Sequence, residues 1–234
     1  MDASPAADIV TLHPRGILFD MDGVLVSSIG SVERTWEAWA KARGIDPALA
    51  IRTAHGRRAI ETVRQLRPDL NDMEELAWLE RMEIADNGGL AMLAGVERIL
   101  ENLPEKYWTV VTSATERLAR SRMEYGGIRV PARIVSADLV TYGKPHPEPY
   151  RKGAELLGLS PAECLVVEDS ASGAKAGHEA GCRVLATLYT HSPASLGDAD
   201  WIVHSLNDVQ VRVTGDALEV RFTPLSRTTA VAGG

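Results

Sequence analysis

The stretch Gly16-Ile17-Leu18-Phe19-Asp20-Met21-Asp22-Gly23-Val24-Leu25 decides the fold of this chain. Its first four residues form a short apolar run, which is typical of a buried strand. The run ends in two carboxylates one residue apart, Asp20 and Asp22, and then a glycine. Unpaired carboxylates are costly to bury, and ligands bind at the carboxyl ends of strands in open α/β sheets. We therefore expect Asp20 and Asp22 to be reactive groups.

A block of helical patterns follows this strand directly. Apolar residues recur at helical spacing over 27–43, and a second helical stretch covers 57–66. A third stretch covers 72–85 and begins after Asn71, a favourable N-cap residue. No strand pattern occurs between about residues 27 and 90. We therefore predict an all-helical insertion that lies over the carboxyl edge of the sheet.

From about residue 91 the pattern changes to alternating strands and helices. Strands are expected at 108–112, 133–135, 165–167, 183–186 and 201–203, and helices at 95–103, 116–125, 147–157 and 171–180. This alternation predicts an α/β fold with a doubly wound, Rossmann-like parallel sheet and helices on both faces. Alternating apolar residues around Thr214-Gly215-Asp216 predict a β-hairpin near the end of the chain.

These patterns divide the chain into two domains. The α/β core domain is expected to comprise residues 15–26 and 91–225, and the small helical cap domain residues 27–90. Residues 1–14 and 226–234 are small or polar for the most part, and we expect flexible tails there.

Composition narrows the class of protein. The net charge of −7 argues against non-specific nucleic-acid binding, which needs a basic face. No apolar run approaches the roughly 18 residues of a membrane span, and the N-terminus lacks the pattern of a secretory signal. The two cysteines, Cys164 and Cys182, are expected to be buried free thiols, with a disulfide as the open alternative. A cytoplasmic monomer is the expected state.

Polar residues stand where the expected core strands end. Thr112-Ser113-Ala114-Thr115 follows the second core strand, and Glu168-Asp169-Ser170 follows a later one. Lys144 lies in the loop Gly143-Lys144-Pro145-His146-Pro147. In a parallel sheet these ends converge on one crevice, where clustered carboxylate oxygens suit Mg²⁺. A hydroxyl and a lysine beside such a metal suit a phosphoryl group, which a carboxylate can attack.

This combination resembles the haloacid dehalogenase superfamily, whose phosphotransferases use an aspartate nucleophile. The resemblance covers about residues 15–213 and rests on four segments in order. They are Phe19-Asp20-Met21-Asp22-Gly23-Val24-Leu25, Val111-Thr112-Ser113-Ala114-Thr115, Gly143-Lys144-Pro145-His146-Pro147-Glu148-Pro149-Tyr150 and Val166-Val167-Glu168-Asp169-Ser170-Ala171-Ser172-Gly173.

The resemblance implies a role for each core residue. Asp20 is the nucleophile, and Asp22 protonates the leaving oxygen and then activates water. The side chains of Asp20 and Asp169 and the backbone carbonyl of Asp22 hold Mg²⁺, with Glu168 close by or acting through water. Ser113-Ala114 and Lys144 bind the phosphoryl oxygens. Thr112 competes with Ser113 for the hydroxyl role, and either hydroxyl could instead cap the following helix.

The cap segment His55-Gly56-Arg57-Arg58 extends the resemblance to one branch of the family. That branch acts on sugar and polyol phosphates and includes glycerol-3-phosphatases, 2-deoxyglucose-6-phosphate phosphatases and hexitol phosphatases. By this resemblance the four residues contact the substrate, with Arg58 rather than Arg57 facing inward. The alternative is that these basic residues form a solvated face.

Two positions depart from relatives within the family. Ser27 stands where many relatives carry an acid, and Val32 stands where β-phosphoglucomutases place a histidine that handles protons. The expected activity is hydrolysis of a small sugar or polyol phosphate monoester through an aspartyl-phosphate. The main alternative is a β-phosphoglucomutase-like phosphomutase. A halide-releasing dehalogenase and a non-enzymatic regulatory protein fit the motifs less well.

Overall fold

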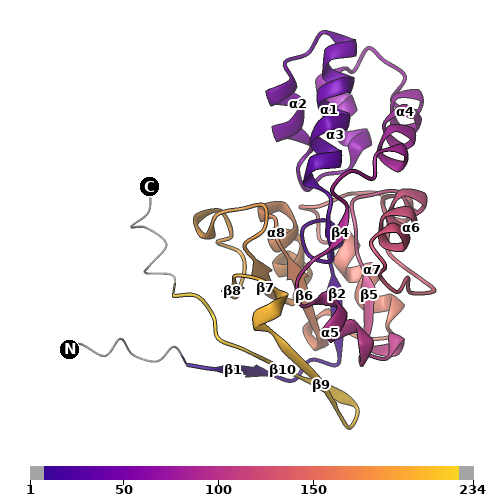
Figure 1. The fold of residues 1–234 in the computed structure, drawn as a ribbon. Coiled ribbons are helices and arrows are strands. Elements are labelled where there is room, and N and C mark those ends of the chain that lie inside the picture. The colour runs from indigo at the N-terminus through magenta and orange to yellow at the C-terminus, as the bar shows by residue number, and fades with distance from the viewer. Residues whose placement is uncertain (1–7, 227–234) are drawn as a thin grey trace.

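The structure is a computed structural model that describes residues 8–226. Figure 1 shows an α/β core with a group of helices above it. The chain passes from the core into these helices and back once, which makes the helical group an insertion in the core. Within residues 8–226, the core also contains five single turns of 3₁₀ helix, at Glu105–Tyr107, Ala137–Leu139, Pro161–Glu163, Pro193–Ser195 and Leu206–Asp208.

The core is built on a five-stranded parallel sheet in the order β5-β2-β6-β7-β8. The strands are β5 (Trp108–Val110), β2 (Gly16–Phe19), β6 (Cys164–Glu168), β7 (Arg183–Thr187) and β8 (Trp201–Val203). Phe19 of the interior strand β2 pairs with Val110 on one side and Val167 on the other. The residues that follow these three positions therefore emerge at the same edge of the sheet.

Helices cover both faces of this sheet. Ile17 and Phe19 of β2 belong to a buried cluster that includes residues of α5 (Val96–Glu101) and α6 (Glu116–Tyr125). Leu18, which points to the opposite face, packs in a second cluster with residues of α7 (Glu148–Leu156) and α8 (Ala171–Ala180). The predicted doubly wound α/β fold is confirmed.

Two local predictions differ from the structure. The strand expected at 133–135 is only a single β-bridge between Val135 and Val111, because the chain turns away after one pairing. Helix α2 (Pro47–Ala54) was not predicted from the sequence, although Asp46 caps it through the Ala48 N–H and Pro47 occupies its first turn.

The predicted hairpin is present as β9 (Gln210–Thr214) and β10 (Ala217–Phe222), and it has a third partner. Strand β1 (Val10–Leu12) pairs antiparallel with β10, and Leu12 is buried. This corrects the expectation of a loose tail throughout residues 1–14. The expected tail at 226–234 lies almost wholly outside the described residues, as does the segment 1–7.

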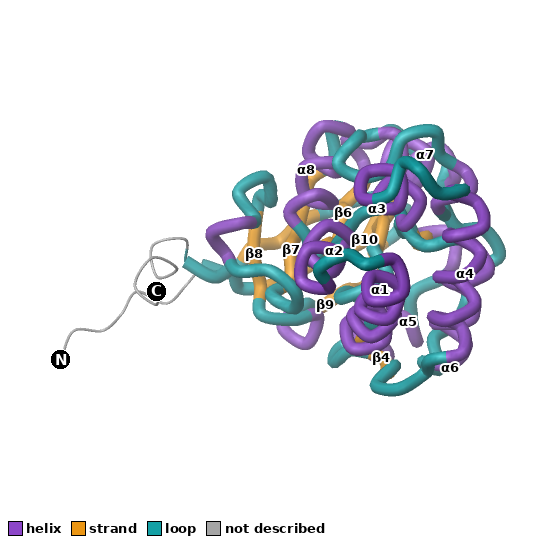
Figure 2. The backbone as a smooth tube through the Cα atoms, turned by 90° about the horizontal axis from the view of Figure 1, so that it is seen from above, coloured by secondary structure: helices purple, strands orange, loops and turns teal. Residues whose placement is uncertain are grey.

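The cap consists of α1 (Ile29–Arg43), α2, α3 (Ala59–Leu66) and α4 (Asp72–Ala85). These helices share their own buried core of Trp36, Trp39, Ala40, Ala50, Ala54, Val63 and Leu79. Viewed from above in Figure 2, α1, α2 and α3 overlie part of the core. Among the described helices, none has both the length and the hydropathy of a membrane span.

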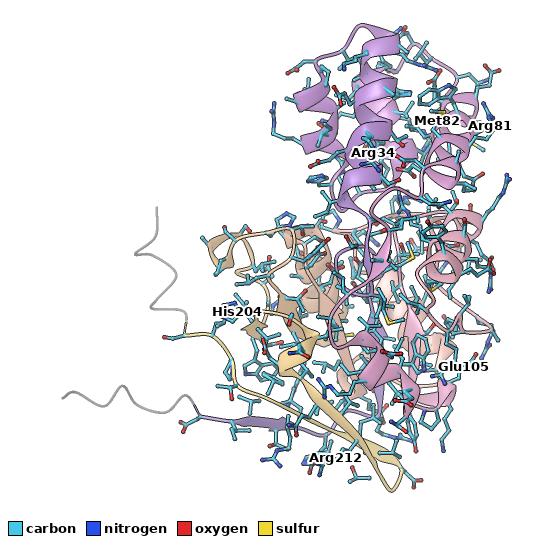
Figure 3. The ribbon with its side chains drawn as sticks, in the orientation of Figure 1. Arg34, Arg81, Met82, Glu105, His204 and Arg212 are labelled. Carbon is cyan, nitrogen blue, oxygen red and sulfur yellow. The ribbon has the colours of Figure 1, made fainter. Side chains whose placement is uncertain are left out.

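The two crossings between the domains lie side by side. Strand β3 (Val26–Ser27) enters the cap and pairs antiparallel with β4 (Ala91–Met92), which leaves it. Beside this pair, Arg34 of α1 (Figure 3) binds the Asp86 carboxylate at 2.7 Å and the Gly88 carbonyl at 2.6 Å. Hydrogen bonds and an ion pair therefore connect the first and last segments of the cap where they join the core.

Candidate active site

The carboxyl edge of the sheet holds a buried ion network. Lys144 Nζ lies 2.7 Å from Asp20 Oδ1 and 2.6 Å from Glu168 Oε1, and it also donates to the Val111 carbonyl at 3.1 Å. Its side chain is 3% exposed. Asp20 follows β2, Glu168 ends β6, and Val111 follows β5, so three adjacent strands supply the partners of one ammonium. These partners raise the pKa of Lys144 against the effect of burial.

Glu168 is fully engaged within the protein. Its Oε1 accepts from Lys144 and from the Tyr150 hydroxyl, and its Oε2 accepts from the backbone N–H of Asp169 and from the N–H and hydroxyl of Ser170. A carboxylate offers about four lone-pair sites, and all of these are used. A Cβ at Gly173 would lie 1.7 Å from Oε1, so glycine is required there. Glu168 therefore acts chiefly by fixing Lys144.

Three acidic side chains crowd the position where a metal was predicted. Carboxylate oxygens of Asp20, Glu168 and Asp169 lie within 4.8 Å of one another. Burial, followed by repulsion from the other two carboxylates, raises the pKa of Asp169 well above its usual range. Burial likewise raises the pKa of Asp20 to about 7, despite the opposing effect of Lys144. One ammonium does not balance three carboxylates, so this oxygen-only donor set fits a divalent cation such as Mg²⁺.

Gly23 allows the two halves of this cluster to approach. Its φ of +83° lies in the left-handed region, which disfavours other residues. A Cβ at this position would lie 1.9 Å from Asp169 Oδ2. The glycine in the opening motif is therefore required both by the turn after β2 and by the proximity of Asp169.

Asp22 is held by a residue that the sequence analysis did not single out. Its Oδ1 accepts from Ser28 Oγ at 2.6 Å and from Arg122 Nη1 at 2.8 Å. Both contacts go to the same oxygen, so Oδ2 has no hydrogen-bond partner among residues 8–226. Arg122 lies on α6, and its side chain is 4% exposed. The carboxyl of Asp22 is thus oriented with one oxygen available to a substrate.

The two neighbouring hydroxyls after β5 have different surroundings. Thr112 is buried, and its Oγ1 accepts from the Ala114 N–H at 3.1 Å, which is a local turn contact. Ser113 and Ala114 line the cavity below the cap, and Ser113 Oγ donates to the Gly56 carbonyl of the cap at 3.4 Å. The geometry favours Ser113 over Thr112 as the hydroxyl that meets a substrate.

All four predicted cap residues, His55, Gly56, Arg57 and Arg58, line the same cavity. Arg58 is buried, and its guanidinium donates to Glu61 and to the Val140 and Thr141 carbonyls of a core loop. The guanidinium of Arg57 donates instead to Gln65 at 2.7 Å within the cap. Arg58 is therefore the inward-facing arginine, as expected, but it holds the cap on the core.

The cavity between the domains has a volume of about 300 Å³. It joins the sheet edge, lined by Asp20, Asp22, Lys144 and Asp169, to an apolar wall of the cap that includes Val32, Trp36 and Leu79. Glu83, Arg122, Thr190 and His191 also line it and were not predicted. Arg122 is one of three arginines in α6, and its helical spacing from Leu118 is the sequence signal that distinguishes it from the exposed Arg117.

The two cysteines lie on the α7–α8 side of the sheet, away from this cavity. Both are buried and free, which confirms the expected free thiols. Burial raises the pKa of each thiol to about 12. Neither cysteine therefore carries the thiolate that nucleophilic chemistry needs.

Comparison with known proteins identifies the family. A family model described as haloacid dehalogenase-like hydrolase matches residues 14–181. Hexitol phosphatase A of Escherichia coli is 37% identical over 202 residues, covering 84% of this chain and 94% of that protein. Glycerol-1-phosphate phosphohydrolase 2 of Saccharomyces cerevisiae is 30% identical over 218 residues, covering 88% of this chain and 87% of that protein.

A solved structure supports the same relationship at the level of the fold. The crystal structure of a hydrolase from Pseudomonas syringae matches with a TM-score of 0.74 at 20% identity, covering 82% of this chain and 94% of that one. The family model and the two named relatives confirm the expectation of a phosphoric monoester hydrolase. The chain belongs to the haloacid dehalogenase-like hydrolases.

Proposed function

We propose that this protein is a Mg²⁺-dependent phosphatase that hydrolyses a small sugar or polyol phosphate monoester through an aspartyl-phosphate. The observation that carries the proposal is the buried network in which Lys144 bridges Asp20 and Glu168 beside Asp169. Relatives that cover most of the chain are named for hexitol and glycerol phosphate substrates. Their names support a small polyhydroxylated substrate here.

In the proposed reaction, a carboxylate oxygen of Asp20 attacks phosphorus while the bond from phosphorus to the ester oxygen breaks. Protonated Asp22 gives its proton to that ester oxygen, so the alcohol leaves uncharged. Asp22 then takes a proton from water, and the water oxygen attacks the aspartyl-phosphate, releasing inorganic phosphate and free Asp20.

The remaining residues bind and orient the phosphoryl group. Lys144 supplies a positive charge, and Ser113 supplies a hydroxyl donor to the phosphoryl oxygens. Asp20, Asp169 and the backbone carbonyl of Asp22 would hold the cation, and Glu168 keeps Lys144 in place. When bound, Mg²⁺ supplies positive charge that screens the carboxylates from the phosphate and stabilises the charge of the transferring group. The closed cap excludes bulk water.

The phosphomutase alternative lacks support at position 32 of the cavity wall. A mutase needs a group that moves protons on the sugar hydroxyls, and the resemblance places the histidine of β-phosphoglucomutases at the position of Val32. Here Val32 lines the cavity and offers no proton-transfer group. We therefore favour hydrolysis, in a cytoplasmic monomer.

A phosphate-release assay tests this proposal. The panel contains glycerol, hexose, deoxyhexose and hexitol phosphates, each assayed with Mg²⁺, with Ca²⁺ and with EDTA. We expect phosphate release from at least one polyol or sugar phosphate with Mg²⁺ and loss of release with EDTA. Isomerised sugar phosphate in the NMR spectrum without free phosphate would instead establish a mutase. Full activity in EDTA would contradict the metal requirement.

A further inference from the structure

The wall of the cavity beyond Asp22 contains a charged pair from both domains. Arg122 on core helix α6 is 3% exposed, and Glu83 on cap helix α4 is 7% exposed. Arg122 Nη2 lies 3.5 Å from Glu83 Oε2, while Nη1 binds Asp22. The neighbours Arg81 and Met82 lie on the exposed side of α4 (Figure 3), so Glu83 is on the side of this helix that faces the core.

Both members of this pair have unused hydrogen-bonding groups. Arg122 Nε and Nη2 are buried without any hydrogen-bond partner in the described part of the chain. Within residues 8–226, the Glu83 carboxylate has only the 3.5 Å ion pair with Arg122. Buried donors and acceptors without partners are costly. Because both residues line the cavity, a ligand in the cavity is the partner that these groups lack.

The rest of the cavity limits the chemistry of that ligand. Its three buried cations each already face a carboxylate: Lys144 faces Asp20 and Glu168, Arg58 faces Glu61, and Arg122 faces Asp22. Part of the cavity wall is apolar and includes Trp36, Val32, Leu79 and Leu118. An uncharged carbon chain with hydroxyl groups fits this wall, because its C–H surface packs on the apolar residues. A second anionic group would meet Arg58 and Arg122 beside carboxylates that already balance their charge.

We propose that Glu83 and Arg122 form the subsite for hydroxyl groups of the leaving alcohol, and that Glu83 excludes phosphate esters with a carboxylate at that position. The Glu83 carboxylate accepts from a substrate hydroxyl, and Arg122 Nε and Nη2 donate to one. The subsite rests on the proposed function, since Asp22 protonates the ester oxygen. The carbon chain attached to that oxygen then continues past Arg122 toward Glu83.

A matched pair of substrates tests the exclusion. Hydroxyethyl phosphate and 2-phosphoglycolate have the same length and differ in a terminal hydroxyl against a carboxylate. We expect the protein to hydrolyse hydroxyethyl phosphate with at least about a tenfold higher kcat/KM, since juxtaposed like charges are strongly unfavourable. Assays at pH 8 keep Glu83 charged, because burial raises its pKa to about 7.

Variants of α4 separate this effect from general damage. Glu83→Gln should lower the ratio of the two kcat/KM values about tenfold, and Glu83→Asp, which retains the charge, should largely preserve it. Glu74→Gln makes the same charge change at an exposed position of the same helix and should leave the ratio unchanged. Both substrates are assayed on one sample, so partial unfolding scales both rates and does not alter the ratio.

The donor side of the subsite has its own test. Arg122→Lys keeps a positive charge beside Asp22 but removes the Nε and Nη2 donors, and should raise KM for glycerol phosphate about tenfold. An unchanged KM would overturn the role of Arg122. Equal kcat/KM values for the matched pair in the parent, or an unchanged ratio in Glu83→Gln, would overturn the exclusion by Glu83. Failure of the parent to release phosphate from any ester would overturn the proposed function itself.

Discussion

The sheet edge and the cap loop 55–58 face each other across one cavity, but they are organised differently. At the sheet edge, Lys144 lies within 2.7 Å of two carboxylates that stand on adjacent strands. In the cap loop, Arg57 binds Gln65 within its own domain, whereas Arg58 binds carbonyls of the core. The register of parallel strands aligns the first group of residues. Only the docking of one domain on the other aligns the second.

This difference has an energetic consequence. The charges at the sheet edge are buried, so each depends on its partners, and removing one partner leaves another charge without compensation. The cap loop lies closer to solvent, where water can replace a lost contact. Substitutions at the sheet edge should therefore have large effects on turnover and stability, and substitutions in the cap loop should act mainly on substrate affinity.

The largest effect is expected for Asp20→Asn. The amide cannot form the aspartyl-phosphate, so kcat on the best substrate of the panel should fall at least about a thousandfold. The variant should retain the circular dichroism spectrum of the parent, because the side chain has the same shape. Turnover close to that of the parent would contradict the assignment of Asp20 as the nucleophile.

Lys144→Met should destabilise the fold as well as abolish most activity. Removal of the ammonium leaves Asp20 and Glu168 buried without a cation, which should lower the free energy of unfolding by about 3–5 kcal/mol. Urea unfolding measures this change. Lys175→Met is the matched control, because Lys175 is exposed and pairs with Glu179 only at 3.7 Å. A decrease of more than about 1 kcal/mol in the free energy of unfolding of Lys175→Met would contradict the expected difference between buried and exposed ion pairs.

Glu83, on cap helix α4 beside Arg122 of core helix α6, should make stability depend on pH. Burial raises its pKa from 4.5 to about 7, while Arg122 opposes this shift and Asp22 and Glu80 add to it. Between pH 4.5 and about pH 7, the carboxyl of Glu83 is ionised in the unfolded chain but still protonated in the folded protein. The folded state therefore binds more protons, and its stability falls as the pH rises through this range. The free energy of unfolding should fall by at most about 3 kcal/mol, and the full decrease is reached above about pH 7.

Urea unfolding at pH 5 and pH 8 measures this dependence. Glu83→Gln does not titrate, so the stability of the parent relative to this variant should fall between the two pH values. A parent that gained stability relative to Glu83→Gln on raising the pH would show that the pKa of Glu83 is lowered rather than raised.

The smallest effects are expected in the cap loop, where Arg58 and Arg57 provide an internal comparison. Arg58→Ala removes the contacts to the core carbonyls and should raise KM about tenfold by loosening the closed cap. Arg57→Ala should change KM by less than about threefold, because its partner Gln65 lies within the cap and is partly solvated. A larger effect of Arg57→Ala than of Arg58→Ala would assign substrate contact to Arg57 instead.

Local signals explain which parts of the fold were predictable. Helices α4, α6 and α8 begin after Asn71, Thr115 and Ser170, and each of these side chains accepts from a backbone N–H of the first turn. Their predicted bounds match the structure. Strand β1 has no comparable local signal, because Val10–Leu12 is too short to show an alternating pattern. Its extended conformation depends on pairing with β10, about 200 residues later in the chain.

The sequence by itself determined the sheet edge, with Asp20, Asp22 and Asp169 after strands that parallel pairing must bring together and Lys144 in the loop before α7. Tertiary structure alone decided the wall formed by Glu83 and Arg122. These two residues lie 39 positions apart on helices of different domains, and the sequence does not show that these two helices face each other. The physical reason is that strand pairing fixes the positions of backbone atoms, whereas the environment of a helix side chain depends on which surface the helix packs against.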